Sequence, residues 1–227
     1  MIGIIGAMEI ETRALIAGVK NAKSETISGI TYTSGELEGK EVVIATCGVG
    51  KVYAAICAQT MILRYAPTLI INTGVAGTLS PSLGIGDVAV ATELLQHDMD
   101  TSPIGDPIGL VSGINKIYFE ADEKTAANLA ECVAACGARA ERGRIASGDQ
   151  FVADAARKKF IREQFSAIAC EMEGAAIAQV ATVNGTPFAV LRAISDSADG
   201  EATMDFPTFA AEASARSVAV LRKFLRA

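Results

Sequence analysis

Phe188-Ala-Val-Leu-Arg-Ala-Ile-Ser-Asp196 is an apolar run, rich in strand-forming residues, that contains Arg192 and ends on an acid. A charge taken out of water costs several kcal/mol unless it is paired, so the arginine needs a partner. Ligands of open α/β proteins bind at the carboxyl ends of strands. We therefore expect a buried strand here. Asp196 is its candidate catalytic acid, with Arg192 on the same face because side chains alternate along a strand.

Strand-like and helix-like segments alternate along the rest of the chain, which is typical of an α/β architecture. Strands are expected at 2–5, 30–34, 41–46, 68–72, 87–92, 142–146, 167–170 and 188–194. Helices are expected at about 9–19, 51–65, 122–137, 153–164, 173–184 and 206–226. Several of the strands are continuous apolar runs, as in sheets covered on both faces. Because 21–34 and 37–41 resemble a hairpin, we expect a three-layer fold with a central mixed β-sheet flanked by helices.

The length of 227 residues, half of them hydrophobic, predicts a single domain covering 1–227. The net charge is −6, and lysine and arginine are scattered, so neither nucleic acid nor an acidic membrane is an expected partner. The apolar N-terminus is short and is followed at once by acids, unlike a signal peptide. No apolar run approaches the ~20 residues that a membrane span needs. We expect a soluble, cytoplasmic protein.

Five cysteines and a single histidine, His97, are the residues that could suggest a metal site. The number of cysteines is odd, no Cys-x-x-Cys occurs, and no histidine cluster completes a site. Reduced thiols are therefore the expected state, and we expect neither a metal nor a cofactor.

Glycine clusters follow several of the expected strands. Gly48-Val-Gly-Lys51 is not a phosphate-binding P-loop, because Ala45 and Val52 stand where that motif needs glycine and a hydroxyl residue. In Asn72-Thr-Gly-Val-Ala-Gly77, which follows a buried strand, we interpret the glycines as letting a small ligand approach the backbone closely at the strand end. Acids also stand where apolar strands end, at Glu9 and Glu11, at Glu171 and Glu173, and at Asp196.

Taken together, eight segments resemble the 5′-methylthioadenosine/S-adenosylhomocysteine nucleosidases of the purine nucleoside phosphorylase-like superfamily. In the family's order and spacing they are Ile4-Ile-Gly-Ala-Met-Glu-Ile-Glu11, Gly48-Val-Gly-Lys-Val52, Ile70-Ile-Asn-Thr-Gly-Val-Ala-Gly77, Gly86-Asp-Val88, His97-Asp-Met-Asp100, Ser147-Gly-Asp-Gln-Phe151, Glu171-Met-Glu173 and Arg192-Ala-Ile-Ser-Asp196. Each is weak alone, but together they cover the chain from end to end.

The resemblance implies hydrolysis of the N-glycosidic bond of 5′-methylthioadenosine and S-adenosylhomocysteine, and also of 5′-deoxyadenosine. The products would be adenine and the 5-thio-substituted ribose. The leaving adenine must be protonated, the oxocarbenium-like ribosyl cation needs nearby negative charge, and a water must lose a proton. In the family pattern Asp196 serves the purine N7, Glu11 activates the water, and Glu173 binds the ribose hydroxyls.

The remaining site residues also follow from the resemblance. Phe151 would stack on the purine, the backbone of Val152 would contact the base edge, and Met172 would lie beside the ribose. Ser195 and Arg192 would position Asp196 and the water. Phe206 would line the 5′ pocket, with Ala7, Met8 and Val49 around the rest of the ligand.

Two places depart from the family pattern. Val75 stands where many members carry a serine near the ribose, which should tune affinity more than abolish activity. The segment 97–115 carries Ile104, Asp106 and Ile108 where well-known members place aromatic residues. In the family this segment lines the 5′ pocket of the neighbouring subunit, so the resemblance implies a homodimer in which Ile104 and Ile108 contact the partner's ligand.

Three alternatives stay open. A purine nucleoside phosphorylase would need a cation for phosphate, and phosphorylase relatives carry an arginine where this chain has Asn72; Glu11 would also repel the anion. Hydrolases of other purine nucleosides use a similar acid. A non-catalytic nucleoside-binding protein could share the fold, although it has no need of a water-activating acid.

Overall fold

The computed structural model describes residues 1–196 and 206–227, without the side chains of residues 196 and 206–208. Its strands are β1 (Ile2–Gly6), β2 (Lys20–Ile27), β3 (Ile30–Leu37), β4 (Lys40–Thr46), β5 (Leu69–Thr78), β6 (Val88–Gln96), β7 (Phe119–Glu120), β8 (Ala140–Ser147), β9 (Ala167–Glu171) and β10 (Phe188–Asp196). Its helices are α1 (Glu9–Ile16), α2 (Lys51–Tyr65), α3 (Glu123–Ala135), α4 (Ala155–Phe165), α5 (Gly174–Asn184) and α6 (Phe206–Arg226). The predicted alternation of strands and helices is confirmed.

All the strands of the described residues join one mixed sheet. β5 pairs with β10 and β9, β10 with β6, β6 with β8, and β8 with β9, so these strands close into a ring. The sheet then continues from β5 through β1 and β4 to the antiparallel edge strands β3 and β2. β1, β5 and β10 are parallel, so their carboxyl ends meet at one edge.

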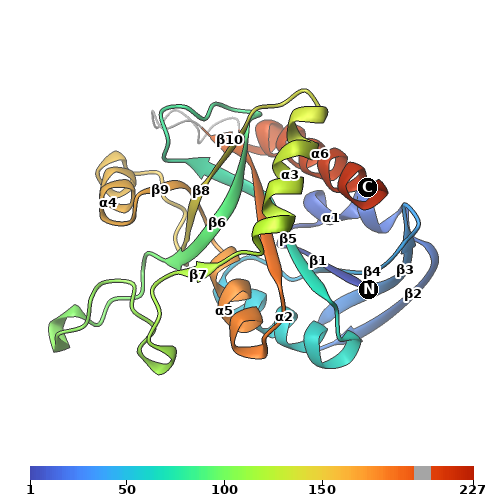
Figure 1. Ribbon diagram of the computed structural model, residues 1–227, viewed down its shortest axis with the longest axis horizontal. Coiled ribbons are helices and arrows are strands. Elements are labelled where there is room, and N and C mark those ends of the chain that lie inside the picture. Colours follow the sequence, from blue (N-terminus) through green and yellow to red (C-terminus); the bar gives the residue numbers. More distant parts are fainter. Residues whose placement is uncertain (197–205) are drawn as a thin grey trace.

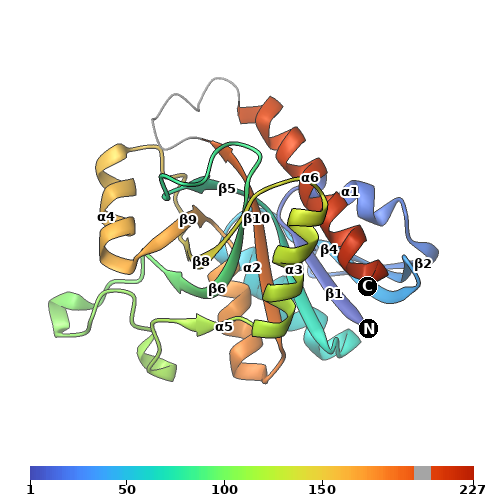
Figure 2. The ribbon, with the colours of Figure 1, turned by 45° about the horizontal axis from the view of Figure 1, so that its top comes forward.

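Helices cover the sheet on two sides, which confirms the three layers. α1, α3 and α6 lie on one side and α2 and α5 on the other (Figures 1 and 2). The neighbouring residues Ile4 and Ile5 show the reason, because they alternate into two different hydrophobic cores. Both side chains are fully buried, as expected for a strand covered on both faces.

The N-terminal edge differs from the expected hairpin. Residues 21–34 form two strands rather than one, and β2, β3 and β4 make an antiparallel meander. The turns are the two-residue pairs Ser28-Gly29 and Glu38-Gly39, all with positive φ. Turns of this conformation match the twist of a hairpin, and glycine tolerates the positive φ at the second position.

The strand expected at 68–72 is longer than predicted, because β5 continues to Thr78. One of its glycines makes room: a Cβ at Gly74 would lie 2.5 Å from Oε1 of Glu11 and closer still to Arg192. The side chain of Asp196 lies outside the described residues, so the face that it was expected to share with Arg192 stays a prediction. Arg192 pairs with Gly74 and Asp196 with Gly77, and the register shifts between Ile194 and Asp196, so alternation is interrupted.

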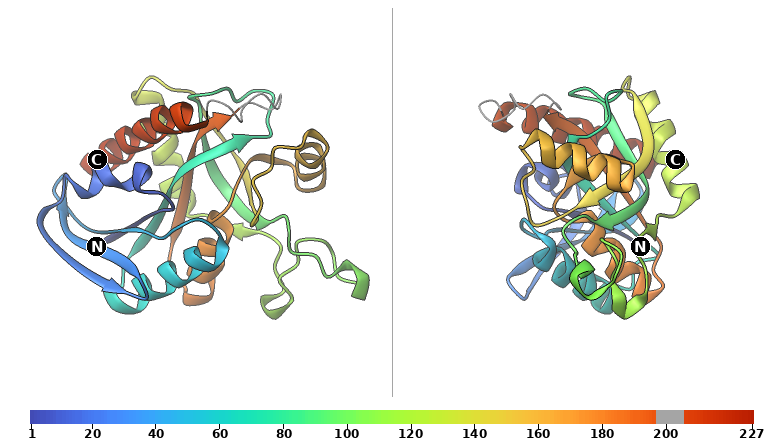
Figure 3. Two further views of the ribbon diagram at one scale, coloured as in Figure 1. Left: turned by 180° about the vertical axis from the view of Figure 1, so that it is seen from behind. Right: turned by 90° about the vertical axis from the view of Figure 1, so that its left-hand side faces the viewer.

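The segment 97–115 projects from the body of the protein (Figures 1 and 3). It contains two short 3-10 turns, Ser102–Ile104 and Ser112–Ile114. The described helices include none with the length and hydropathy that would let it cross a bilayer.

Candidate active site

The candidate site lies where the parallel strands β1, β5 and β10 end. An open pocket lies there. It is lined by Val75, Ala76, Gly77, Gln150, Phe151, Val152, Cys170, Glu171, Met172, Glu173 and Ser195. Six of the residues that the sequence singled out as site residues are therefore in one pocket: Val75, Phe151, Val152, Met172, Glu173 and Ser195. Phe151 is 55% exposed beside this pocket.

Glu11 is held beside this pocket at the start of α1. Its Oε2 accepts hydrogen bonds from the backbone N–H groups of Ala7 and Met8, at 2.8 and 2.9 Å. Its Oε1 accepts from the N–H of the pocket residue Val75, at 3.1 Å. The carboxylate is almost completely buried, and three backbone donors replace the water it has lost. Ala7 and Met8 thus position Glu11 through their backbones.

Glu173 follows β9 and is the N-cap residue of α5. Its Oε1 accepts a hydrogen bond from the N–H of Gly50, at 2.9 Å, and its Oε2 lies 3.6 Å from Arg192. Burial and the negative charge of Glu171 raise the pKa of Glu173 to about 7. The group therefore changes charge near neutral pH. Val49, which precedes Gly50, is half exposed and does not line the pocket of a single chain.

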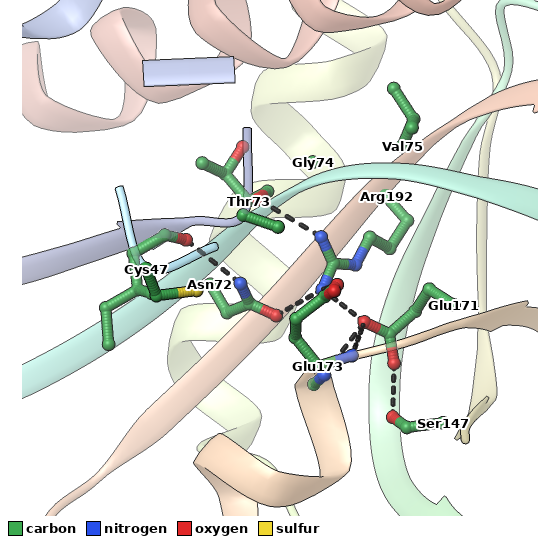
Figure 4. Close-up of polar contacts among 12 residues, drawn as sticks. Cys47, Asn72, Thr73, Gly74, Val75, Ser147, Glu171, Glu173 and Arg192 are labelled. Carbon is green, nitrogen blue, oxygen red and sulfur yellow. Dashed lines mark hydrogen bonds and ion pairs between the residues drawn. The ribbon is translucent and has the colours of Figure 1, made fainter. Parts of the chain in front are cut away.

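Glu171 is the functional residue that the sequence reasoning left without a role. Its carboxylate pairs with Arg192, accepts from the hydroxyl of Ser147, and accepts from the N–H groups of Glu173 and Gly174 at 2.9 and 2.8 Å (Figure 4). The sequence did contain a signal for this residue: Arg192 lies within an apolar strand, and a buried arginine requires a buried acid nearby.

Arg192 is fully buried at the centre of this network. Besides Glu171, its guanidinium donates to the side-chain oxygen of Asn72 and to the carbonyl of Thr73, the latter at 3.1 Å (Figure 4). Asn72 donates in turn to the carbonyl of Ile5, at 2.9 Å. Asn72, at the position where phosphorylases carry an arginine, is thus a neutral residue that accepts a hydrogen bond from Arg192.

Ser195 is buried in the pocket wall, and its hydroxyl has no hydrogen-bond partner among the described groups. The side chains of Asp196 and Phe206 lie outside the described residues. In the projecting segment, Ile104 is 82% exposed, whereas Ile108 packs against a core cluster of its own chain.

Comparison with known proteins gives the same result for sequence and structure. The family described as the phosphorylase superfamily matches residues 1–226. A curated 5′-methylthioadenosine/S-adenosylhomocysteine nucleosidase of Shewanella halifaxensis is 40% identical over 227 residues, covering 99% of this chain and 98% of that protein. The Neisseria meningitidis nucleosidase in complex with methylthio-immucillin-A is 36% identical, with a TM-score of 0.94 and coverage of 99% and 98%. The futalosine hydrolase of Helicobacter pylori is also 36% identical, with a TM-score of 0.92 and coverage of 98% and 96%.

Proposed function

The chain belongs to the phosphorylase superfamily and, within it, to the 5′-methylthioadenosine/S-adenosylhomocysteine nucleosidases; on this premise we propose that Glu11, Glu173 and Asp196 carry its reaction. It is a hydrolase of N-glycosidic bonds that releases adenine from 5′-methylthioadenosine and S-adenosylhomocysteine. The observation that carries the residue assignment is that Glu173 lies 3.6 Å from the buried guanidinium of Arg192, whose pKa is also raised by the charge of Glu11.

Asp196 is the acid that protonates the purine N7. It stands at the end of β10, and its backbone partner is the pocket residue Gly77. Proton transfer at this point turns adenine into a neutral leaving group. Phe151 stacks on the base, and the open hydroxyl of Ser195 contributes a polar contact in the same wall.

Glu173 binds the ribose hydroxyls and faces the positive charge that develops on the sugar. Burial raises its pKa to about 7, and the positive charge that develops on the sugar favours the ionised form. Glu11 accepts the proton of the attacking water, and its fixed geometry keeps the base in place for the attack. Met172, which directly precedes Glu173 in the sequence, lines the pocket on the side of the ribose.

Water rather than phosphate is the nucleophile. A phosphate site needs free cations or free backbone N–H groups. Here Arg192 is committed to buried acids, and Lys51 is paired with Asp98. The N–H groups of Ala7, Met8 and Val75 already bind the carboxylate of Glu11, which leaves a negative charge where phosphate would sit.

The enzyme acts as a homodimer in the cytoplasm, in the salvage of methionine from its nucleoside by-products. Support for the dimer comes from an apolar surface on and beside α2, made by Val49, Val52, Tyr53, Ile56 and Leu63, each of which is at least 39% exposed. An exposed apolar patch of this kind is typical of a subunit contact. Ile104, on the projecting segment, then reaches the 5′ end of the partner's ligand.

Futalosine hydrolysis is the second candidate, favoured by the likeness to the Helicobacter pylori futalosine hydrolase. Adenine or hypoxanthine release should be measured on 5′-methylthioadenosine, S-adenosylhomocysteine, 5′-deoxyadenosine, adenosine, inosine and futalosine, with and without phosphate. We expect the two thio-nucleosides to be preferred and phosphate to have no effect. An absolute requirement for phosphate, with a ribose 1-phosphate product, would identify a phosphorylase instead.

The Asp196→Asn variant tests the proposed acid. We expect it to bind 5′-methylthioadenosine but to turn it over several orders of magnitude more slowly, because an amide cannot supply the proton. Wild-type turnover would exclude Asp196 as the acid. Binding without turnover in the wild type, on all the nucleosides, would favour a non-catalytic binding protein.

A further inference from the structure

The first turn of α2 contacts Glu173 of the site and Asp149, which directly precedes a stretch of the pocket wall. The N–H of Gly50 donates to Glu173 at 2.9 Å, and the N–H of Lys51 donates to Asp149 at 2.7 Å. These are helix N-terminal N–H groups, which have no partner inside the helix and favour carboxylates. The Gly48-Val-Gly-Lys51 motif therefore places a helix start against the site, with carboxylates where a P-loop would hold phosphate.

The side chain of Lys51 connects the same turn to the end of β6. Its ammonium donates to Gln96 at 2.9 Å and to Asp98 at 2.7 Å. The two charged side chains are only 18% and 15% exposed, so solvent screens their attraction less than at an open surface. Burial alone would raise the pKa of Asp98, but Lys51 and the N–H of Asp149 outweigh it and hold that pKa below its usual range.

Asp98 closes a ring of contacts. One of its carboxylate oxygens binds Lys51, and the other accepts from the N–H of Asp149 at 2.9 Å. Asp149 in turn accepts from the N–H of Lys51. Three segments that are distant in sequence are thus joined through charge-assisted hydrogen bonds, which are stronger than neutral ones.

The segment that this ring holds is the one that faces the ligand. Gln150, Phe151 and Val152 follow Asp149 directly and line the pocket. Gln96 extends the network by donating to Gln179 of α5, the helix that Glu173 begins. Lys51 itself is not part of the pocket lining.

We propose that Lys51 is a positioning residue for substrate binding: through Asp98 and Asp149 it holds 148–152 against the pocket and fixes the helix turn that binds Glu173. The proposal rests on the proposed function and deepens it. Lys51 acts through other residues and touches neither the base nor the reacting atoms. Losing its charge frees the segment that carries Phe151 and Val152, which weakens binding of the base more than it slows the chemical step.

Lys51→Met tests this, since it removes the charge and keeps most of the side-chain length. Folding is checked by circular dichroism, and kinetics are measured with 5′-methylthioadenosine well below the melting temperature. We expect KM and the adenine dissociation constant to rise about tenfold, with a smaller change in kcat. Lys51→Arg should recover most of the affinity, because it keeps the charge. Lys116→Met is the matched control, since Lys116 pairs with Glu120 at the exposed surface.

A double-mutant cycle with Asp98→Asn separates positioning from general destabilisation. We expect the double variant to be no worse in KM than the worse single variant, because both changes break one ring. A folded Lys51→Met protein with wild-type KM and adenine affinity would overturn the proposal. Additive losses in the cycle would overturn it as well.

Hydrogen exchange of the amides in 148–152, measured without ligand, keeps this test independent of the reaction. Lys51→Met should speed exchange there at least tenfold while leaving the buried strand β1 unchanged. If the wild type released adenine from none of the nucleosides, the proposed function would be wrong, but the exchange measurement would still test the role of Lys51. Unchanged exchange in 148–152 would refute the role of Lys51 alone.

Discussion

The guanidinium of Arg192 and the carboxylate of Glu171 form an ion pair inside the protein, where Arg192 is fully buried and the Glu171 side chain is 2% exposed. Neither charge can be compensated by solvent, so each depends on the other. The same carboxylate also accepts the N–H groups at the start of α5, next to Glu173. The pair therefore affects both the stability of the fold and the charge of a candidate catalytic acid.

Glu171→Gln should destabilise the protein by about 3 kcal/mol, because it removes the direct ion-pair partner of Arg192 and leaves its charge with the more distant carboxylates of Glu173 and Glu11. The negative charge of Glu171 helps to raise the pKa of Glu173, so its removal should lower that pKa. The acid side of the kcat/KM profile should then move to lower pH. Chemical denaturation and the pH–rate profile measure the two effects.

Glu163→Gln is the control for this prediction, since Glu163 is 59% exposed in a surface pair with Lys159. It should change neither stability nor the pH profile measurably. An unshifted acid limb in a folded Glu171→Gln enzyme would contradict the electrostatic link between the two glutamates.

Glu173→Gln should abolish most turnover but stabilise the protein at pH 8. The folded state raises the pKa of Glu173 from 4.5 to about 7, so native protein binds this proton more tightly than the unfolded chain does. Stability from this group is then present below about pH 4.5 and is lost as the pH rises towards 7, by up to about 3 kcal/mol.

Glutamine resembles the protonated acid at every pH, so the variant escapes this loss. Its gain in unfolding free energy over the wild type should be small at pH 5 and largest at pH 8. Urea unfolding at both values measures the difference. A gain that is equal at the two pH values would show that Glu173 has no raised pKa.

Gly74→Ala should inactivate the enzyme and lower its stability by more than 1 kcal/mol, since overpacking a buried site costs about 1–3 kcal/mol. A methyl group there would collide with both Arg192 and Glu11, whose positions are fixed by buried hydrogen bonds. Gly113→Ala is the control, because a Cβ at Gly113 meets no atom within 4 Å. Assays of adenine release and melting temperature on both variants test the steric argument.

Much of the fold could be predicted from the sequence because its signals are local. Ile4 and Ile5 occupy two different cores, and a run of such residues predicts a strand covered on both faces. The end of β5 was predicted too early, at Asn72, because glycines usually weaken strands, whereas Gly74 continues β5 and makes room for Arg192 and Glu11. A register shift such as the one before Asp196 depends on pairing between distant strands, so it has no local signal.

The residues of the site likewise divide into those that local motifs predict and those that only the tertiary structure identifies. Glu173, Met172 and Phe151 could be placed from motif order, and they meet in one pocket. The partners of Arg192 could be anticipated as acids, but choosing Glu171 required the fold, since the two residues are on different strands. The ring around Lys51 was not foreseeable, because it joins three segments that only the tertiary structure brings together.

The apolar surface on α2 predicts that dimerisation and activity are linked. Val52→Glu combined with Ile56→Glu places two charges on neighbouring turns of that helix, where Val52 is 69% exposed and Ile56 39%. We expect a monomer by light scattering at micromolar concentration, because a buried unpaired charge opposes association. Lys124→Glu, at an exposed position of α3 on the other side of the sheet, should leave the dimer intact.

A pocket built by residues of both subunits can be tested separately from dimerisation itself. If Ile104 serves the partner's ligand, a Glu11→Gln chain and an Ile104→Asp chain are each impaired as homodimers. In the heterodimer one pocket combines the intact Glu11 of one chain with the intact Ile104 of the other, so mixing should restore activity at one of the two sites. Heterodimers verified by two affinity tags that show no recovery would mean that each chain builds its pocket alone.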